Sequence, residues 1–294
     1  MTTMLDVARV DELDGIVGAL RTWQDDAAPR QLHPGDLGWY WRFGAEATAA
    51  AVRTWSRAGR TLAVGLLDGP ELLRLAFAPG AERDEELARR LVEDVTRPER
   101  GVLPAGTVSV DAPDGALVQG LLAEAGWELG ELWTPLRRDL AEPVEDPGVR
   151  IEVAGPRQGP VRAAVHRAAF ARPTFTDERR NAMAAGSPYA DARCLLAYDA
   201  RGAAVAAVTV WSAGRGRPGL LEPMGVHPEH RGHGYGRAIT VAAAAALRAL
   251  GSSSALVCTP SDNAAAVATY ASAGFRRLPE FRDRCRDGDL THSV

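Results

Sequence analysis

The sequence predicts an α/β (α+β) protein that contains the same architecture twice, each time as a mixed twisted sheet flanked by helices. Strand and helix patterns alternate through residues 150–294, and the same order recurs more weakly in residues 1–141. The segment 142–149 carries two prolines and three acids without apolar periodicity, which is typical of an exposed linker. We therefore expect two tandem domains, 1–141 and 150–294.

The C-terminal half has the clearer pattern. Asp199–Gly202 predicts a hairpin turn between two apolar runs, and Gly251 predicts the end of a long helix. Period-2 and period-3.6 hydrophobicity assign the other elements. We expect strands at 150–153, 194–198, 203–211, 220–226 and 255–258, a strand region from 275, and helices at 161–170, 234–250 and 263–273.

The N-terminal half repeats the later part of this order. Pro79 takes the place of Pro228, and the pair Gly126-Trp127 takes the place of Gly274-Phe275. An internal duplication explains this better than two unrelated domains. We expect strands at 61–67, 72–78 and 107–110, and helices at 84–95 and 116–125.

Composition argues against several classes of protein. The formal charge is −4, whereas nucleic-acid binders normally show a basic face or stripe, so we expect no nucleic-acid partner. No apolar run approaches the ~20 residues of a membrane span, and the N-terminus lacks a signal-peptide pattern. Three scattered cysteines predict neither a disulfide framework nor a zinc cluster, and no acid or cysteine completes a metal site with His227 and His233. We expect a cytoplasmic protein without a metal.

The most informative segment runs from Val226 to Arg237. A strand ends, glycines follow at 232, 234 and 236, and a long helix begins. Glycine lets backbone N–H groups converge without obstruction by Cβ atoms, and a helix N-terminus favours an anion. Arg231 and Arg237 add positive charge at the edges of the loop. These features predict a pyrophosphate site.

Two other phosphate-binding loops fit less well. A Walker loop ends in Gly-Lys-Ser/Thr, which a chain without lysine cannot supply. The dinucleotide fingerprint requires a different glycine spacing and an acid about 20 residues further on to hold a ribose. Alanines occupy most of that stretch here, around 242–246.

Two motifs resemble the GNAT N-acetyltransferase superfamily. Arg231-x-x-Gly234-x-Gly236 matches its R/Q-x-x-G-x-G/A signature. Asn263-x-x-Ala266-x-x-x-Tyr270-x-x-x-Gly274-Phe275 resembles the helical element that follows this loop in GNAT enzymes, and its spacing places the named positions on one helix face. Together the motifs cover about 50 residues in the family's order.

The resemblance implies acetyl-CoA as cosubstrate, with its pyrophosphate on the loop amides and its pantetheine near Asn263 and a bulged strand. Pro223 and Gly225 independently indicate a bulge within 220–226. An amide of that strand aimed at the acetyl carbonyl would stabilise the oxyanion. The implied cofactor-binding residues are Met224, Gly225, Val226, Arg231, Gly232, His233, Gly234, Tyr235, Gly236, Arg237 and Asn263.

Two residues are candidates for catalysis. The resemblance places Tyr270 near the thioester sulfur, and a neutral tyrosine can donate a hydrogen bond or proton to the departing thiolate. Glu222 could remove the proton of an ammonium acceptor. The alternatives are a tyrosine in the core and a glutamate facing solvent. Weaker candidates for an acceptor pocket are Trp211 and the segment 170–189, with Arg172, Phe175 and Tyr189.

The N-terminal copy lacks these features. Alignment on Pro79 places Glu82 at the position of Arg231, Glu85 at that of Gly234 and Leu87 at that of Gly236, and Leu122 replaces Tyr270. Acids at a helix start stabilise the helix but repel an anion. We expect this degenerate copy not to bind coenzyme A and instead to support the catalytic half or shape its acceptor cleft.

The sequence therefore predicts an acetyl-CoA-dependent N-acetyltransferase that acts on a primary amine by direct attack in a ternary complex. No Ser-His or Cys-His arrangement suggests a covalent intermediate. The tandem arrangement resembles mycothiol synthase-type proteins and some antibiotic-modifying acetyltransferases, which leaves a small-molecule or peptide amine open as acceptor. A non-catalytic acyl-CoA sensor or scaffold is the alternative. We expect no membrane partner and a monomer or homodimer.

Overall fold

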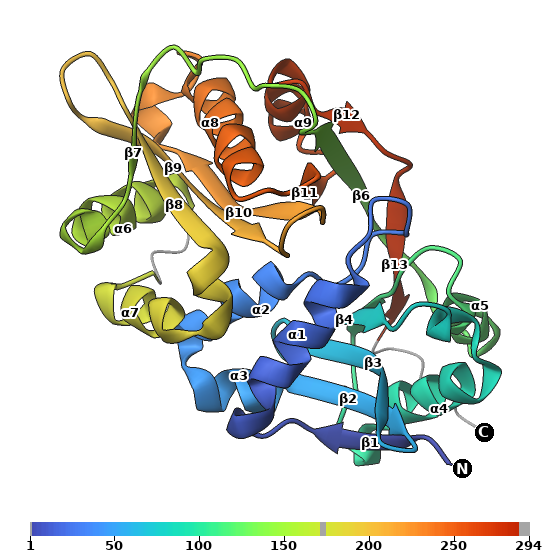
Figure 1. The fold of residues 1–294 in the computed structure, drawn as a ribbon. Coiled ribbons are helices and arrows are strands. Elements are labelled where there is room, and N and C mark those ends of the chain that lie inside the picture. The colour runs from blue at the N-terminus through green and yellow to red at the C-terminus, as the bar shows by residue number, and fades with distance from the viewer. Residues whose placement is uncertain (1, 171–174, 288–294) are drawn as a thin grey trace. The chain divides into compact units, whose positions relative to one another are not determined.

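The computed structural model describes residues 2–170 and 175–287, and the chain separates into two compact units (Figure 1). The first unit comprises 1–33, 46–132 and 281–294, and the second comprises 34–45 and 133–280. The units differ from the predicted division at 142–149, because segments from each half of the sequence belong to the other half's unit.

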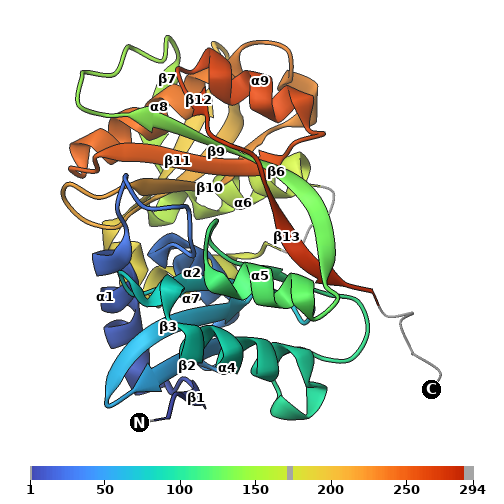
Figure 2. The same cartoon turned by 90° about the vertical axis from the view of Figure 1, so that its right-hand side faces the viewer.

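Strand pairing explains this exchange. The long strand β6 (Glu128–Asp139), continuous in Figure 2, begins in the first unit, and its residues from Trp133 onward pair antiparallel with β11 (Ser254–Pro260) of the second. In return, β13 (Phe281–Arg286), at the C-terminal end of the chain, pairs antiparallel with β5 (Val108–Asp111) of the first unit. Strands of a sheet are held by hydrogen bonds to their neighbours. These pairings therefore place the later residues of β6 in the second unit and β13 in the first.

The first unit contains a mixed sheet. Its neighbouring strands are antiparallel, except that β4 and β5 are parallel. In spatial order the strands are β1 (Met4–Val7), β2 (Val52–Arg57), β3 (Arg60–Leu67), β4 (Leu72–Phe77), β5 and β13. The α-helices are α1 (Leu13–Trp23), α3 (Ala45–Ala51), α4 (Glu85–Thr96) and α5 (Leu117–Glu124), and the short 3-10 turns are η1 (Val10–Glu12), η3 (Ala81–Arg83) and η4 (Pro98–Arg100).

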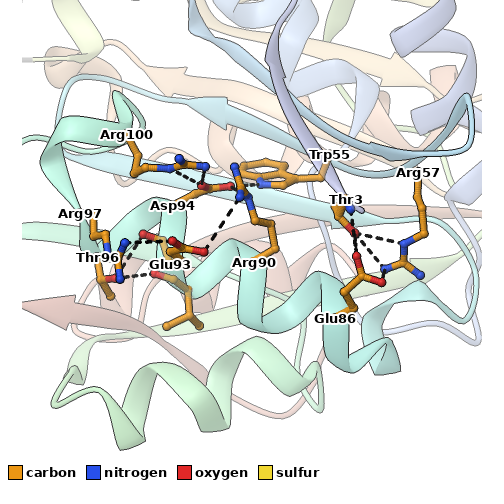
Figure 3. Close-up of polar contacts among 11 residues, drawn as sticks. Thr3, Trp55, Arg57, Glu86, Arg90, Glu93, Asp94, Thr96, Arg97 and Arg100 are labelled. Carbon is orange, nitrogen blue, oxygen red and sulfur yellow. Dashed lines mark hydrogen bonds and ion pairs between the residues drawn. The ribbon is translucent and has the colours of Figure 1, made fainter. Parts of the chain in front are cut away.

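Helix α4 is fastened to this sheet by a buried carboxylate (Figure 3). Asp94 accepts a hydrogen bond from the Trp55 indole at 3.0 Å and forms ion pairs with Arg90 and Arg100 at 2.9 and 2.8 Å. Burial raises the pKa of Asp94, which the tryptophan and the arginine contacts oppose. Such a group is tolerated in a core because its oxygens are hydrogen-bonded.

The second unit contains the other mixed sheet. Here β10 and β11 are the parallel pair, and the remaining neighbours are antiparallel. In spatial order the strands are the later residues of β6, then β11, β10 (Gly219–Val226), β9 (Ala204–Ser212), β8 (Ala192–Tyr198) and β7 (Arg150–Val153), and the short β12 (Arg276–Arg277) also pairs with β6.

Helices cover both faces of this sheet (Figure 1). Leu195 and Ala197 of β8 belong to the core under α8 (Tyr235–Ala249) and α9 (Ala264–Ser272), whereas Cys194 and Leu196 face the other side. Alternate residues of a strand point to opposite faces, so both sides of β8 are buried. The second face carries α6 (Gly159–Ala169), α7 (Asp177–Ala185) and α2 (Pro34–Tyr40), with the 3-10 turns η2 (Trp41–Phe43), η5 (Pro156–Gln158) and η6 (Ser187–Asp191).

The predicted fold class is confirmed. Every strand and helix predicted with defined ends is present, with its ends within two residues of prediction. The elements that the patterns did not assign lie mainly in the first 60 residues and at the two exchanged strands. Among the described residues, no helix is long and apolar enough to cross a membrane.

Candidate active site

The centre of the second unit is a gap between two strands. β10 and β11 are paired only at Gly219 with Ala255 and at Leu220 with Leu256, near the start of each strand. Beyond these pairs the strands separate. The separation leaves an edge of β10 whose backbone groups have no neighbouring strand, which is where an extended ligand can bind a sheet.

A bulge in β10 lies where the separation begins. Leu221 is opposite Val210 of β9 and Met224 is opposite Val208, so Glu222 and Pro223 together face the single residue Thr209. This two-against-one arrangement is a β-bulge, as the proline and glycine of this strand predict.

The ladder beyond the bulge sets the direction of the backbone amides. The His227 N–H donates to the Val205 carbonyl at 2.8 Å, so the hydrogen-bonded pairs of the antiparallel ladder include His227 and Gly225. The N–H and C=O groups of Met224 and Val226 therefore point away from β9, toward the gap. Gly225 differs from the prediction, because its amide is used within the sheet.

Gly225 has a packing role instead. A Cβ atom there would overlap Ala169 and lie 3.0 Å from the Phe170 ring at the end of α6. Only glycine lets the helix end approach the strand this closely, so Gly225 contributes to the site by positioning α6.

The glycine loop after β10 has the conformation that its sequence predicts. It passes through the 3-10 turn η7 (Pro228–His230) and reaches α8 through Gly232 and Gly234, which have φ angles of 80° and 83°. These are left-handed conformations that other residues adopt at a cost of about 1 kcal/mol or more. A Cβ atom at either position would meet no heavy atom within 4 Å, so both glycines border open space.

Helix α8 begins without a side-chain cap. Gly234 occupies the N-cap position, and as a glycine it has no side chain that could accept a hydrogen bond from the first turn. The first N–H groups of a helix have no intrahelical acceptor, and together with the helix dipole they attract an anion. The N-terminus of α8 can therefore hold a phosphate group.

The third glycine of the motif has a different function. A Cβ atom at Gly236 would lie 2.9 Å from Thr269 Cγ2 of α9 and 3.5 Å from Val226 Cγ2. Gly236 therefore allows α8 and α9 to pack closely. A glycine is therefore needed at this position of the motif for helix packing as well as for the loop.

Arg231 binds backbone carbonyl groups beside the loop. Its Nε donates to Val226 at 3.4 Å and its Nη2 donates to Ala169 at 3.1 Å. The side chain is exposed, so its charge is accessible from the loop. Arg231 thus ties the loop to the end of α6.

Arg237 is held by an ion pair that the sequence did not predict. Its Nε donates to the Ser272 carbonyl at 3.0 Å, and its Nη2 lies 3.3 Å from Glu145, which also pairs with Arg138. The predicted linker 142–149 thus supplies an acid that neutralises part of the charge expected at the pyrophosphate site.

Tyr270 lies in the core beneath the gap. It is 6% exposed, and its ring centroid lies 6.1 Å from that of Phe275. Burial raises the pKa of the Tyr270 hydroxyl, and the neighbouring Cys258 and Glu222 raise it further. Tyr270 is therefore close enough to Glu222 and to Cys258 of β11 for their charges to act on its hydroxyl. The tyrosine is neutral at physiological pH.

Asn263 caps helix α9. Its Oδ1 accepts a hydrogen bond from the Ala266 N–H at 3.1 Å, and the residue is exposed. This contact explains the three-residue spacing of Asn263 and Ala266 in the motif. A role for Asn263 in cofactor binding stays a prediction.

The last two predicted residues lie on the rim of the loop. His233 Nδ1 lies 2.9 Å from the Arg231 carbonyl oxygen, and the rings of His233 and Tyr235 are 6.4 Å apart. Tyr235 also lines an open pocket of about 690 Å³ with Arg150, Tyr198 and the turn 199–202. This pocket adjoins the N-terminus of α8.

The corresponding helix of the first unit is capped by an acid. Asp84 precedes α4 and accepts a hydrogen bond from the Leu87 N–H at 2.9 Å. Arg57 forms an ion pair with Asp84 at 2.8 Å and lowers the pKa of that carboxyl to about 2. Glu86 accepts from the Thr3 N–H at 2.9 Å and also contacts Arg57 (Figure 3). These contacts occupy the start of α4, where the second unit has its glycine loop, as predicted for this copy.

The helix starts also correct the alignment of the two copies. Gly234 and Asp84 are the N-cap residues, and each helix begins at the next residue. Asp84 therefore corresponds to Gly234, one position from the predicted match of Glu85. The loop between Pro79 and its helix is one residue shorter than the loop between Pro228 and α8. The predicted alignment assumed loops of equal length and was therefore wrong by one position.

The open edge of β4 in the first unit is occupied by the chain itself. The Leu32 N–H donates to the Leu75 carbonyl at 3.0 Å, and the Gln31 Oε1 accepts from the Phe77 N–H at 3.0 Å. By alignment on the prolines that follow, Leu75 and Phe77 correspond to Met224 and Val226. Next to this segment, Arg30 forms a salt bridge with Asp111 at the end of β5.

Trp211 supports the bulge in a way that the sequence did not show. Its Nε1 donates to the Glu222 carbonyl at 2.7 Å, and its ring lies against Gly38 of α2, where a Cβ atom would overlap it. Trp211 is only 1% exposed, so it positions Glu222 and does not line an open wall. Arg172, another predicted acceptor residue, lies outside the described residues.

Among the residues that the structure describes, no group of three or more His, Cys, Asp or Glu side chains is arranged to hold an ion.

Comparison with known proteins agrees with this geometry. Residues 164–275 match the sequence model of the Acetyltransferase (GNAT) family. The chain is similar to a GCN5-related N-acetyltransferase from Sphaerobacter thermophilus, at 18% identity over 97% of this chain and 95% of that one, with a TM-score of 0.59. No curated protein sequence matches the chain.

Two further solved structures share the complete architecture. A tandem GNAT protein from the clavulanic acid biosynthesis pathway is 17% identical over 98% of this chain and 99% of that one, with a TM-score of 0.59. A GNAT-family acetyltransferase from Colwellia psychrerythraea is 15% identical over 97% and 99%, with a TM-score of 0.58. At these identities the similarity shows the fold, and it confirms the predicted tandem arrangement. Together with the matched family model, it shows a tandem GNAT-type fold whose second unit contains the residues that match the acetyltransferase family.

Proposed function

We propose that the second unit transfers an acetyl group from acetyl-CoA to a primary amine, directly and without an acyl-enzyme. The observation that carries this proposal is the gap between β10 and β11, where the amides of Met224 and Val226 lie at the open edge that leads to the uncapped start of α8. An extended ligand with amide groups at one end and a pyrophosphate at the other suits this edge and this loop.

The reaction uses three groups of the chain. The nitrogen of the amine attacks the thioester carbonyl carbon, and a strand amide pointing into the gap stabilises the oxyanion. The carbon–sulfur bond then breaks, and the electron pair stays on sulfur as a thiolate. Tyr270, kept neutral by its raised pKa, donates a hydrogen bond to that sulfur. Glu222 accepts the proton that the nitrogen loses, directly or through water.

We propose further that the first unit binds no acyl-CoA. Asp84 and Glu86 bring negative charge to the start of α4, and residues 31 and 32 occupy the edge of β4. A ligand would have to displace two hydrogen bonds and approach two carboxylates. This unit serves instead as a structural support for the second.

The proposal is tested by measuring CoA release from acetyl-CoA over a panel of primary amines, with the wild-type chain and the variants Tyr270→Phe and Glu222→Gln. We expect turnover with at least one amine and a loss of about 10²-fold or more in each variant. Glu222→Gln should recover as the pH rises, because the free amine then forms without a base. If both variants turn over as fast as wild type, the assigned roles are wrong.

A sensor or scaffold would give a different result. Calorimetry would show acetyl-CoA binding to the wild-type chain, while no amine of the panel would be acetylated. That outcome would overturn the catalytic proposal and leave the cofactor site intact.

A further inference from the structure

A buried arginine lies on the face of the second sheet opposite α8. Arg162 of α6 is 3% exposed. Its Nη2 donates to the hydroxyl of Thr209, but its Nε and Nη1 are buried without a partner among the described residues. A guanidinium carries five N–H donors, and buried donors are normally paired. Two unsatisfied atoms on one buried cation indicate a missing acceptor.

A second arginine lies in the same part of the second unit. Arg180 of α7 also has a buried Nε without a partner in the described part of the chain. Burial raises the pKa of the half-buried Tyr189 hydroxyl, and the charges of Arg162 and Arg180 both oppose that rise. The nearby Ser187 hydroxyl is also buried and unpaired among the described residues. A buried charge without a counter-ion costs several kcal/mol, so this arrangement suits an anion that arrives from outside.

Aromatic side chains enclose the site. Arg162 lies over the Phe175 ring at 4.8 Å from its centroid, and the Trp39 ring is stacked with Phe175 at a centroid distance of 5.4 Å. His166 lies 4.9 Å from Phe175 and, because of burial and the nearby arginines, its pKa is lowered to about 4. The imidazole is therefore neutral near pH 7 and does not compete with the arginine for an anion.

The register of the sheet places Arg162 next to the proposed reaction centre. Thr209, its hydrogen-bond partner, is the residue of β9 that faces the bulge at Glu222 and Pro223. Neighbouring strands lie about 4.8 Å apart. Trp211, in the same apolar cluster as Phe175, donates to the Glu222 carbonyl. An acceptor could thus place its nitrogen at the bulge and a group a few bonds away at Arg162.

We propose that the acceptor of this enzyme is an amine that carries an anionic group, such as a carboxylate, a few bonds from its nitrogen, and that Arg162 binds this group. This inference rests on the proposed acetyltransferase function and deepens it. It specifies the class of acceptor, which neither the motifs nor the fold determine.

The test compares three acceptors of similar length: β-alanine, taurine and propylamine, which end in a carboxylate, a sulfonate and a methyl group. For the wild-type chain we expect kcat/KM to be about 10- to 100-fold higher for an anionic amine than for propylamine, as a charge-assisted hydrogen bond predicts. The better of β-alanine and taurine identifies the anion. Equal values for all three amines would overturn the inference while leaving the acetyltransferase function in place.

The variant Arg162→Met removes the charge at similar volume, and Arg157→Met is the matched control, an exposed arginine of the preceding turn. We expect the preference for the anionic amine to fall to about one in Arg162→Met, mainly through KM, and to persist in Arg157→Met. Arg162→Lys should recover part of it. A structural role alone would lower kcat/KM for all three amines equally, which would contradict the inference.

A binding measurement covers the case in which no amine is acetylated. In the presence of CoA, the anionic amine should raise the thermal midpoint of the wild-type chain, and propylamine should not. The same shift in Arg162→Met would overturn the inference. No turnover together with an Arg162-dependent shift would instead reject the acetyltransferase proposal and retain the anion site.

Discussion

The start of α8 and the start of α4 are two versions of one structural element with opposite electrostatic character. In both, a strand leads through a 3-10 turn into a helix, yet the N-cap is Gly234 in one and Asp84 in the other. The carboxylate satisfies the first turn of α4 from within the chain. The glycine leaves the first turn of α8 for an external anion, so the stabler helix start is the one that cannot bind phosphate.

The strand edges differ in the same way. The edge of β4 donates a hydrogen bond to Gln31 and accepts one from Leu32, whereas the corresponding edge of β10 faces the gap. The helix ends after the two motifs are nevertheless alike: Gly126 and Gly274 have φ angles of 85° and 82°, and Trp127 and Phe275 donate to Leu122 and Tyr270 respectively. The two copies therefore differ in the residues that line this region, while the scaffold around it is the same.

The largest expected effect is that of the variant Tyr270→Leu. It gives the second unit the residue type that the first unit has at the equivalent position, Leu122. We expect kcat to fall by about 10²- to 10⁴-fold, because the hydrogen bond to the departing sulfur is lost, while the dissociation constant of acetyl-CoA stays unchanged. Tyr270→Phe is the control for packing, since it removes only the hydroxyl. If Tyr270→Phe retained wild-type kcat, the loss in Tyr270→Leu would come from a cavity and the assigned role would be wrong.

The second largest effect is expected for the variant Gly234→Asp, which gives the start of α8 the N-cap residue that α4 has, Asp84. Asp and Asn both tolerate a left-handed conformation, so Gly234→Asn controls for the backbone. We expect acetyl-CoA to bind about 10- to 30-fold more weakly to the aspartate variant than to the asparagine variant, because a carboxylate would face the pyrophosphate. Calorimetry at rising salt should narrow this difference. Equal affinities for the two variants would place the pyrophosphate elsewhere.

Sequence patterns predicted the parts of the molecule that local chemistry determines. Hydrophobic periodicity predicts the strands and helices that were assigned in both copies. The glycine loop and the Asn263–Phe275 motif are predicted by residue types that particular backbone conformations require. Gly236 allows close helix packing and Asn263 caps a helix, so a motif residue can have a structural role that its place in the motif does not reveal.

The remaining features depend on segments far apart in the sequence. The pairing of Arg237 with Glu145 joins residues 92 positions apart, and the pairing of Cys285 with Ser109 in β13 and β5 joins residues 176 apart. The insertion of Gln31 beside β4 and the place of Gly38 under Trp211 have no local signature either. Arg162 looks like an ordinary helix residue until its burial is known.

A smaller effect concerns the acid that replaced the glycine. Because the folded pKa of Asp84 is about 2, below its usual 3.8, the carboxylate contributes stability that is present above pH 3.8 and is lost as the pH falls toward 2. Asp84→Asn keeps a capping side chain but loses the ion pair with Arg57. We expect it to lower the free energy of unfolding by about 1–2 kcal/mol at pH 7, with a smaller difference at pH 2–3.

Denaturant unfolding at the two pH values measures this difference, and acetyl-CoA affinity is the control. If Asp84→Asn altered the affinity, the first unit would have a part in cofactor binding that its own capped helix does not suggest.

The smallest effect concerns the chain segment at the edge of β4. Gln31 accepts from the Phe77 N–H and donates to the Trp23 carbonyl at 2.9 Å, so Gln31→Ala leaves both groups without these partners. We expect a loss of about 1 kcal/mol of unfolding free energy, near the net value of a hydrogen bond. Gln31→Glu is the matched control, because it keeps the acceptor and loses only the donor.

No acetyl-CoA binding should appear in the first unit of Gln31→Ala, because Leu32 still bonds to β4 and Asp84 still caps α4. Calorimetry that gave a second acetyl-CoA site per chain would show that the inserted segment alone keeps the first unit empty. One site per chain, with reduced stability, would mean that the charge at the start of α4 is sufficient to exclude the anion even when the strand edge is weakened.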